Sequence, residues 1–450
     1  MTKFAFFGCW NEVHYPSKKN LDVPCFKIQE NETKTKCDEF STVLEEIKRQ
    51  PDIDFLIVAG DNYYPQKKTE NEIKTKTFIT EDFEKGFNAL KSIDKPTYLL
   101  LGNHDVDNIV PKEKSKKDKS KTKPKKGGTT TTPTKKKKAK ICTIIEKEID
   151  FVKDSNIKMF DYKTKLIVKE MQETNTLCIM VDTSIFIESL DCYAPLLNES
   201  DKYMDKNQII NKQKDMVGNI IREYRDQNKK PITNVCFFGH HPLLCLKKKE
   251  NNPNIILEDT NMEWNRFLFH VILDNKLQDI SNIYYFCADL HQYQEGIVTI
   301  HDNNGNQIKI IQYIAGTGGA YMDPKIVPDQ ITPDQITKEH LQEISIKEDD
   351  SEYKENVIHS SYKMTKSIKV NGFLIIHDNP NSSLRIDFYP VFLFHTKIKT
   401  LSDSSSLKSR SRSRRQSHYL SRRGNKQIKT SQSLGGKTKK IKRKYKKNKH

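Results

Sequence analysis

Five short segments of the chain contain residue types that can bind metal ions. Each has Asp, His, Asn or Cys directly after a glycine or an alanine, and the segments are Gly8–Asn11, Gly60–Tyr64, Gly102–Asp105, Gly239–Pro242 and Ala288–His291. Carboxylate, imidazole and thiolate groups are the common protein ligands of divalent transition metals. One such segment alone is compatible with an ordinary turn, but five in series predict a shared metal site.

Each of these segments follows a short apolar run that must position it. Runs of this length that end at glycine are typical of fully buried strands. Seven such runs are present: Phe4–Phe7, Phe55–Ala59, Tyr98–Leu101, Leu177–Val181, Val235–Phe238, Ile283–Cys287 and Ile308–Ala315. Amphipathic stretches predict helices at Cys37–Arg49, Glu81–Ile93 and Asn207–Gln227, and a late hairpin is expected from Gly372–His377 and Leu384–Tyr389. This alternation indicates an α/β fold, in which ligand sites lie at the carboxyl ends of the strands.

The series resembles the motifs of the calcineurin-like metallophosphoesterases over about residues 3–320, namely Gly-Asp, Gly-Asp, Gly-Asn-His-Asp/Glu, Gly-His and Gly-His-x-His. Three further features are similar to the purple acid phosphatase branch of that family: Trp10 directly after Cys9, Tyr64 three residues after Asp61, and the glycine turn Gly316–Gly319. The resemblance implies a four-layer α/β/β/α sandwich of two mixed sheets flanked by helices, with two divalent metal ions at one edge.

The resemblance also implies a role for each polar side chain in these segments. The first metal ion would be held by Cys9, Asp61, Tyr64 and His291. The second would be held by Asp61, Asn103, His240 and Asp289, so that Asp61 bridges the two. Zinc, manganese and iron are the candidate ions.

Three more residues are expected to act on the substrate. By resemblance, His104 faces the leaving group or the phosphate, and Asp105 could orient His104 from behind. His241 either faces the substrate or packs within the fold. The reaction implied is hydrolysis of a phosphate ester by in-line attack of a metal-bound hydroxide, as in acid phosphatase-like hydrolases.

Two ligand positions depart from the family pattern. Position 9 is Cys where the family has Asp, and position 289 is Asp where the family has His. Both replacements can still bind a metal, and a thiolate favours zinc over magnesium or manganese. The alternative is that Cys9 is a small buried apolar residue and that the first site is impaired. The chain would then be a catalytically impaired relative that serves as a binding module.

The net charge of +18 is concentrated in two segments of low complexity. Residues 401–450 carry +17 and residues 111–140 carry +12, which leaves −11 on the other 370 residues. This distribution excludes a nucleic-acid binder that is basic throughout. We expect a disordered Lys-rich insertion at 111–140, a mobile charged insertion with short helices at 324–366, and a disordered tail.

The boundaries expected from composition are a metallophosphoesterase domain at 1–400 and a basic tail at 401–450. Non-specific nucleic-acid binding is one function of such a tail, and a solvated tail without a partner or a localisation signal are the alternatives. The residues that would contact phosphates are Arg410, Arg412, Arg414, Arg415, Lys439, Lys440 and Arg443. The composition of the tail weakly resembles basic tails on proteins of giant DNA viruses.

The partner expected at the site is a phosphorylated small molecule or a polyanionic substrate, because the Lys-rich insertion directly follows Asp105. No apolar run reaches the length of a membrane-spanning helix or a signal peptide, so we expect a cytoplasmic protein, with a nuclear or virion-associated location through the tail as the alternative. The nine cysteines are scattered within apolar segments, a pattern that favours reduced thiols over a disulfide framework. The oligomeric state is left open.

Overall fold

The structure is a computed structural model. It describes residues 2–13, 39–70, 73–106, 142–163, 167–171, 175–228, 231–248, 255–259, 262–280, 282–320, 322, 358–379 and 382–391. The expected Lys-rich insertion at 111–140, residues 324–357 of the charged insertion, and the basic tail at 401–450 lie outside these residues. The described residues all belong to one compact unit, Met1–His395.

The first large sheet has six strands in the order β17-β16-β1-β2-β5-β6. These strands are β1 (Thr2–Phe7), β2 (Phe55–Val58), β5 (Thr97–Leu99), β6 (Ile157–Met159), β16 (Gly372–Asp378) and β17 (Arg385–Pro390). Strands β1, β2, β5 and β6 are parallel, and β16 and β17 extend the sheet as an antiparallel hairpin. The parallel register places the ends of β1, β2 and β5 side by side.

The second large sheet has seven strands in the order β15-β13-β14-β12-β9-β8-β7. They are β7 (Ile167–Met171), β8 (Thr176–Met180), β9 (Asn234–Phe238), β12 (Asn282–Cys287), β13 (Tyr293–Asp302), β14 (Gln307–Ala315) and β15 (Ile358–Ile368). Strands β8, β9, β12 and β14 are parallel, and the outer strands are antiparallel. Two small hairpins lie outside both sheets, β3 (Gln66–Glu70) with β4 (Ile73–Thr77), and β10 (Leu244–Lys248) with β11 (Ile255–Asp259).

The alternation of side chains along β1 shows how the layers pack. Phe4 and Phe6 belong to the core between the sheets, where the ring of Phe6 lies 5.6 Å from that of Phe286 on β12. Phe7 points to the opposite face and belongs to the core under the first helices. Full burial of each such side chain contributes roughly 1.5–3 kcal/mol to stability.

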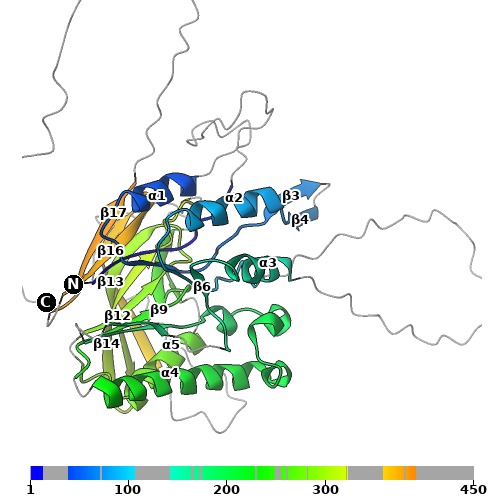
Figure 1. Ribbon diagram of the computed structural model, residues 1–450. Coiled ribbons are helices and arrows are strands. Elements are labelled where there is room, and N and C mark those ends of the chain that lie inside the picture. The colour runs from blue at the N-terminus through cyan, green and yellow to red at the C-terminus, as the bar shows by residue number, and fades with distance from the viewer. Residues whose placement is uncertain are drawn as a thin grey trace, which may run out of the picture. The chain divides into compact units, whose positions relative to one another are not determined.

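Helices cover the outer face of each sheet. On the first sheet these are α1 (Glu39–Lys48), α2 (Thr80–Lys91) and α3 (Thr143–Val152). The buried apolar residues of α1 and α2, with Ile144 of α3, join the core around Phe7. Figure 1 shows α4 (Lys206–Asn228) and α5 (Met262–Asp274) on the side of the molecule opposite α1 and α2. Four short 3₁₀ turns connect β8 to α4, namely η1 (Ser184–Phe186), η2 (Leu190–Cys192), η3 (Ala194–Leu196) and η4 (Asp201–Tyr203). The result is the expected four-layer α/β/β/α sandwich.

Two expectations from the sequence are wrong. The charged insertion does not extend to residue 366, because residues from Ile358 onward form β15, which pairs along β13. The cysteines are not all thiols either, because Cys142 and Cys192 form a disulfide across 50 residues. This bond joins the start of α3 to η2, and nothing in the spacing of the nine cysteines singles out that pair.

No helix among the described residues is both long enough and apolar enough to cross a membrane.

Candidate metal centre

Three strand ends share an unusual backbone conformation. Cys9, Asp61 and Asp289, which follow β1, β2 and β12, have φ angles of 52°, 51° and 52°. This left-handed region costs a residue other than glycine roughly 1–2 kcal/mol, although Asp tolerates it better than most. Strain of this kind persists where the surrounding structure enforces it, and it concentrates at functional sites.

Glycines allow these strand ends to approach one another closely. A Cβ atom on Gly102 would overlap the backbone nitrogen and the carboxylate of Asp61. A Cβ atom on Gly8 would collide with the side chain of Ala288, which directly follows β12 of the other sheet. The loops after β1, β2, β5 and β12 therefore meet at one edge of the sandwich, and the first three of them contain a glycine, Gly8, Gly60 and Gly102.

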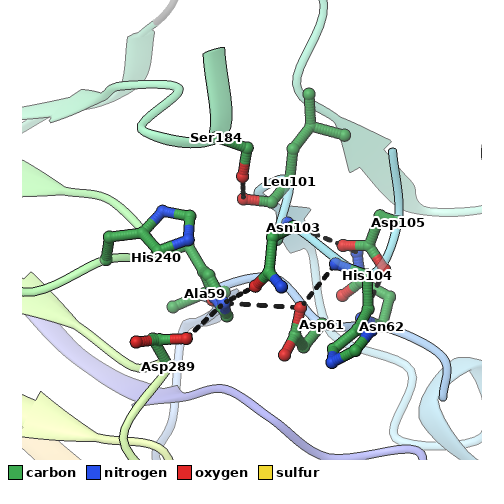
Figure 2. Close-up of polar contacts among 12 residues, drawn as sticks. Ala59, Asp61, Asn62, Leu101, Asn103, His104, Asp105, Ser184, His240 and Asp289 are labelled. Carbon is green, nitrogen blue, oxygen red and sulfur yellow. Dashed lines mark hydrogen bonds and ion pairs between the residues drawn. The ribbon is translucent and has the colours of Figure 1, made fainter. Parts of the chain in front are cut away.

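Asp61 lies at the centre of this edge. The hydroxyl of Tyr64 donates to its Oδ2 at 2.8 Å, and the backbone N–H of His104 donates to its Oδ1 at 3.1 Å. The ligand atoms of Cys9, Asp61 and His240 all lie within 4.8 Å of one another. Figure 2 shows Asp61, Asn103 and His240 converging from three different loops.

His240 is oriented so that one ring nitrogen faces this cluster. Its Nδ1 lies 2.6 Å from the carbonyl of Ala59, to which it can only donate, and its Nε2 lies 3.2 Å from Oδ1 of Asn103. The same Nε2 is 3.3 Å from Asp61 and 3.7 Å from Asp289. Burial lowers the pKa of His240, but the negative charges of Asp61 and then Asp289 outweigh it and raise the pKa to about 9. The pocket therefore favours a positive charge at this nitrogen.

Tyr64 connects Asp61 to the last of the five segments. Its hydroxyl lies 3.0 Å from Nε2 of His291, and its ring contacts that of His104 with centroids 4.8 Å apart. Burial, with the charges of Asp61 and Cys9, raises the pKa of Tyr64 well above its usual value. A cation beside these groups would reverse the electrostatic part of that shift.

Asp105 orders the loops that carry the cluster. It accepts hydrogen bonds from the backbone N–H groups of Asn62 and Gly102 and from the side chain of Asn62. Burial and the charge of Asp61 raise the pKa of Asp105 to about 7. Glu148 of α3 is a second buried acid here, and burial and the charge of Asp105 raise its pKa well above the usual range.

His241 follows His240 directly and is held by Thr183. Its Nδ1 lies 2.9 Å from the hydroxyl of Thr183, and one of its ring nitrogens lies within 4.8 Å of the ligand atoms of His240 and Asp289. Burial and the positive charge of His240 lower the pKa of His241 to about 4, so its ring is neutral.

Family comparison agrees with this arrangement. The family model of the calcineurin-like phosphoesterases matches residues 2–293. The chain belongs to the calcineurin-like phosphoesterase family. No curated protein matches it. Among solved structures, one described as the structure of PhoD is similar, with 12% identity over 86% of this chain and 68% of that chain and a TM-score of 0.38.

The calcineurin-like phosphoesterase family implies divalent metal ions, and the residues present fit them. The cluster combines two carboxylates, a thiol, a phenol, an amide and imidazoles, which is a donor set suited to transition metals. The negative charges of Asp61 and Asp289 raise the pKa of His240 despite its burial. A divalent cation would supply the positive charge that the pocket favours.

All ten site residues expected within the phosphoesterase domain lie at this edge. They are Cys9, Asp61, Tyr64, Asn103, His104, Asp105, His240, His241, Asp289 and His291. The seven basic residues expected in the tail lie outside the described residues, so nucleic-acid binding stays a prediction. Thr183 and Glu148 were not expected, because a lone Thr or Glu carries no motif. Asn62 lies within the segment Gly60–Tyr64, but no role was expected for it.

Proposed function

We propose that this chain is a metal-dependent hydrolase of phosphate esters with a dinuclear centre related to that of the purple acid phosphatases. The observation that carries the proposal is the convergence of Cys9, Asp61 and His240, whose ligand atoms lie within 4.8 Å of one another. These residues come from three strands of two different sheets. Cys9 and Asp61 have left-handed backbone angles, and the ring of His240 is hydrogen-bonded to the carbonyl of Ala59. These constraints support a convergence that the fold enforces.

The first metal ion would be held by Cys9, Asp61, Tyr64 and His291. The contacts of the Tyr64 hydroxyl with both Asp61 and His291 support a ligand at this position, as in the purple acid phosphatase branch. The thiol of Cys9 is buried beside them and favours zinc. Manganese and iron are the other candidates.

The second metal ion would be held by Asp61, Asn103, His240 and Asp289. The tautomer of His240 is set by its bond to Ala59, which leaves Nε2 available. Asp289 has 31% of its side chain accessible, so this side of the centre faces the solvent from which a substrate arrives.

Two bound cations would withdraw charge from the phosphate and lower the pKa of an attacking water. The protein contributes the positions of the groups around them. The backbone of His104 is fixed by Asp61 and its ring is supported by Tyr64, so the imidazole stands beside the centre, where it can hydrogen-bond the phosphate or the leaving group. A phosphorylated small molecule is the substrate class we propose, with a polyanion as the alternative because of the Lys-rich segment that follows Asp105.

Metal analysis combined with hydrolysis of p-nitrophenyl phosphate and bis-p-nitrophenyl phosphate tests this function. The chain should purify with or take up close to two zinc or manganese ions, lose hydrolysis on chelation, and regain it on reconstitution. Metal binding without hydrolysis of either ester would favour the alternative of an impaired binding module. A chain that binds no metal from solutions of zinc, manganese and iron would contradict the proposal altogether.

Tyr64→Phe tests the first metal site against a matched control. We expect Tyr64→Phe to reduce the metal content towards one ion and to lower kcat at least about 10-fold, as loss of a metal-supporting group does. The control is Tyr63→Phe, because the hydroxyl of Tyr63 bonds to the backbone carbonyl and N–H of Ile79. Equal metal content and activity in both variants would exclude Tyr64 as a ligand.

A further inference from the structure

Thr183 lies in the loop after β8, directly before η1, and belongs to none of the five motif segments. Its side chain is fully buried, and its hydroxyl makes three contacts with the pair His240 and His241. The oxygen lies 3.1 Å from the backbone nitrogen of His240, 3.0 Å from that of His241, and 2.9 Å from Nδ1 of the His241 ring.

The hydrogen-bonding capacity of a hydroxyl determines what each contact is. A threonine hydroxyl has two lone pairs and one proton. The two backbone N–H groups can only donate, so they occupy both lone pairs of the Thr183 oxygen. The single proton of Thr183 is then donated to Nδ1 of His241, which must be unprotonated.

This assignment fixes the chemical form of His241. A neutral imidazole with an unprotonated Nδ1 carries its proton on Nε2. Metal ligation through Nε2 would require the proton on Nδ1, where it would face an oxygen that has no lone pair left. The His241 ring is therefore a poor ligand, although one of its nitrogens lies within 4.8 Å of ligand atoms of His240 and Asp289.

We propose that Thr183 is a positioning residue that holds His241 as a neutral hydrogen-bond donor, whose Nε2–H contacts a non-bridging oxygen of the bound phosphate. The inference rests on the proposed function for the identity of the acceptor. Such a donor stabilises the charge that develops on the phosphoryl oxygens without taking part in proton transfer. The same hydroxyl fixes the backbone of His240, so that one side chain aligns a metal ligand and a substrate contact.

The surroundings hold Thr183 in place. Asp182 accepts hydrogen bonds from the backbone of Ser184 at 2.9 Å and from the hydroxyl of Tyr162 at 2.8 Å, and its own N–H donates to Gln213. On the other side, the hydroxyl of Tyr285 donates to the carbonyl of His241. All of these groups are buried, so the position of the hydroxyl is determined by the fold.

Nitrogen NMR of the full chain labelled with ¹⁵N-histidine reads the tautomer directly. In the zinc-loaded wild-type protein, the His241 signals, assigned by their loss in His241→Asn, should show an unprotonated Nδ1 and a protonated Nε2. Addition of inorganic phosphate should shift the Nε2–H signal. A protonated Nδ1, or no response to phosphate, would overturn the proposal.

Activity variants test the consequence for turnover. Thr183→Val removes the hydroxyl and should lower kcat about 10- to 100-fold with a much smaller change in KM, whereas Thr183→Ser should restore most of the loss. The metal content of both variants should be measured as well. If kcat falls only in proportion to the bound metal, Thr183 acts only through the metal ligand His240. Equal kcat in Thr183→Val and wild type would also overturn the proposal.

The two arms separate this inference from the proposed function. A wild-type chain that hydrolyses neither ester contradicts the phosphoesterase proposal, and the NMR spectrum still decides the tautomer of His241. If Thr183→Val does not fold, the NMR spectrum of the wild-type protein and the kinetics of Thr183→Ser still test the role of Thr183. Thr176→Val is the matched control, because Thr176 is another fully buried threonine with a hydrogen-bonded hydroxyl at the opposite end of β8. It should leave the His241 signals unchanged.

Discussion

Two polar clusters lie at opposite ends of β9 and β12. The candidate metal centre occupies the carboxyl ends of β1, β2, β9 and β12. At the amino end of the second sheet, Thr176, Asn234 and Asn282 begin β8, β9 and β12, and Asp378 ends β16 of the first sheet beside them. We call these four residues the amino-end cluster.

Donors and acceptors match in the amino-end cluster. The hydroxyl of Thr176 donates to Asp378 at 2.9 Å and accepts from the amide of Asn234 at 3.2 Å, and Asn282 donates to Asn234 at 3.1 Å. The four residues have no left-handed φ angle. The bond between Thr176 and Asp378 joins the two large sheets directly.

The metal centre differs in both respects. Cys9, Asp61 and Asp289 adopt left-handed backbone angles. Two carboxylates, those of Asp61 and Asp289, lie 3.3 and 3.7 Å from the same Nε2 of His240, so donors and acceptors are not matched one to one. We therefore expect the polar groups to serve stability at the amino end and, under the proposed function, metal binding at the carboxyl end. This contrast predicts that mutations at the metal centre lower activity and metal content more than stability, and that mutations in the amino-end cluster lower stability more than activity.

The largest effect is expected from Asp61→Asn. The amide keeps the shape and tolerates the left-handed angle but removes the bridging charge, so hydrolysis should fall at least about 10³-fold and bound metal should be lost. Urea unfolding should change much less than activity. Asp94→Asn is the matched control, because Asp94 is also left-handed, with φ of 54°, but is exposed on the turn after α2. Full activity in Asp61→Asn would refute the assignment of the centre.

Addition of zinc should stabilise the metal-free protein. A ligand that binds only the folded chain at one hundred times its Kd stabilises it by about 2.7 kcal/mol, which a thermal or urea titration detects. The stabilisation should disappear in Asp61→Asn and persist in Thr176→Val. If zinc left the unfolding curve of the wild-type protein unchanged, the candidate metal centre would not bind zinc.

Thr176→Val should show the reverse pattern. Loss of the hydroxyl leaves buried groups of Asp378 and Asn234 with one partner fewer, which costs about 2 kcal/mol of unfolding free energy. Metal content and kcat should be unchanged, because the site lies at the other end of the strands. Thr365→Val, at an exposed threonine of β15, should change stability by no more than about 0.5 kcal/mol. A drop in kcat with full stability would remove the distinction between the two ends.

Much of this architecture follows from local sequence. The seven apolar runs and three amphipathic stretches all correspond to strands or helices, because buried parallel strands need continuous apolar runs and their loops need glycine. The local pattern does not mark the other strands and α-helices, namely β3, β4, β6, β7, β10, β11, β13, β15, α3 and α5. Strand β13 contains Gln294, Glu295 and Gly296 with a register shift between the last two, and Ser360 and Ser361 make β15 polar. Strands β13 and β15 form because they pair with neighbouring strands, and the local sequence pattern does not encode that pairing.

The site could be located from strand ends, but its supporting contacts could not. Glycine before a polar residue marks Cys9, Asp61 and Asn103 in the sequence. Thr183 and Glu148 act only through residues that are distant along the chain, and no spacing rule identifies them. The disulfide between Cys142 and Cys192 could not be predicted either, because it depends on the path of the chain around α3.

Cys9→Asp should give the smallest of these effects and the sharpest test of the first metal site. The substitution replaces a soft thiolate by a hard carboxylate at a position whose φ of 52° suits Asp better than Cys. We expect the ratio of zinc to manganese affinity to fall about tenfold, which corresponds to about 1.4 kcal/mol. Competition titrations of the metal-free protein measure that ratio. Cys287→Ser is the control, because Cys287 is equally buried near the end of β12 but is not among the clustered ligand atoms. An unchanged ratio in Cys9→Asp would mean that the sulfur of Cys9 does not bind the metal, and the first site would then consist of Asp61, Tyr64 and His291 alone.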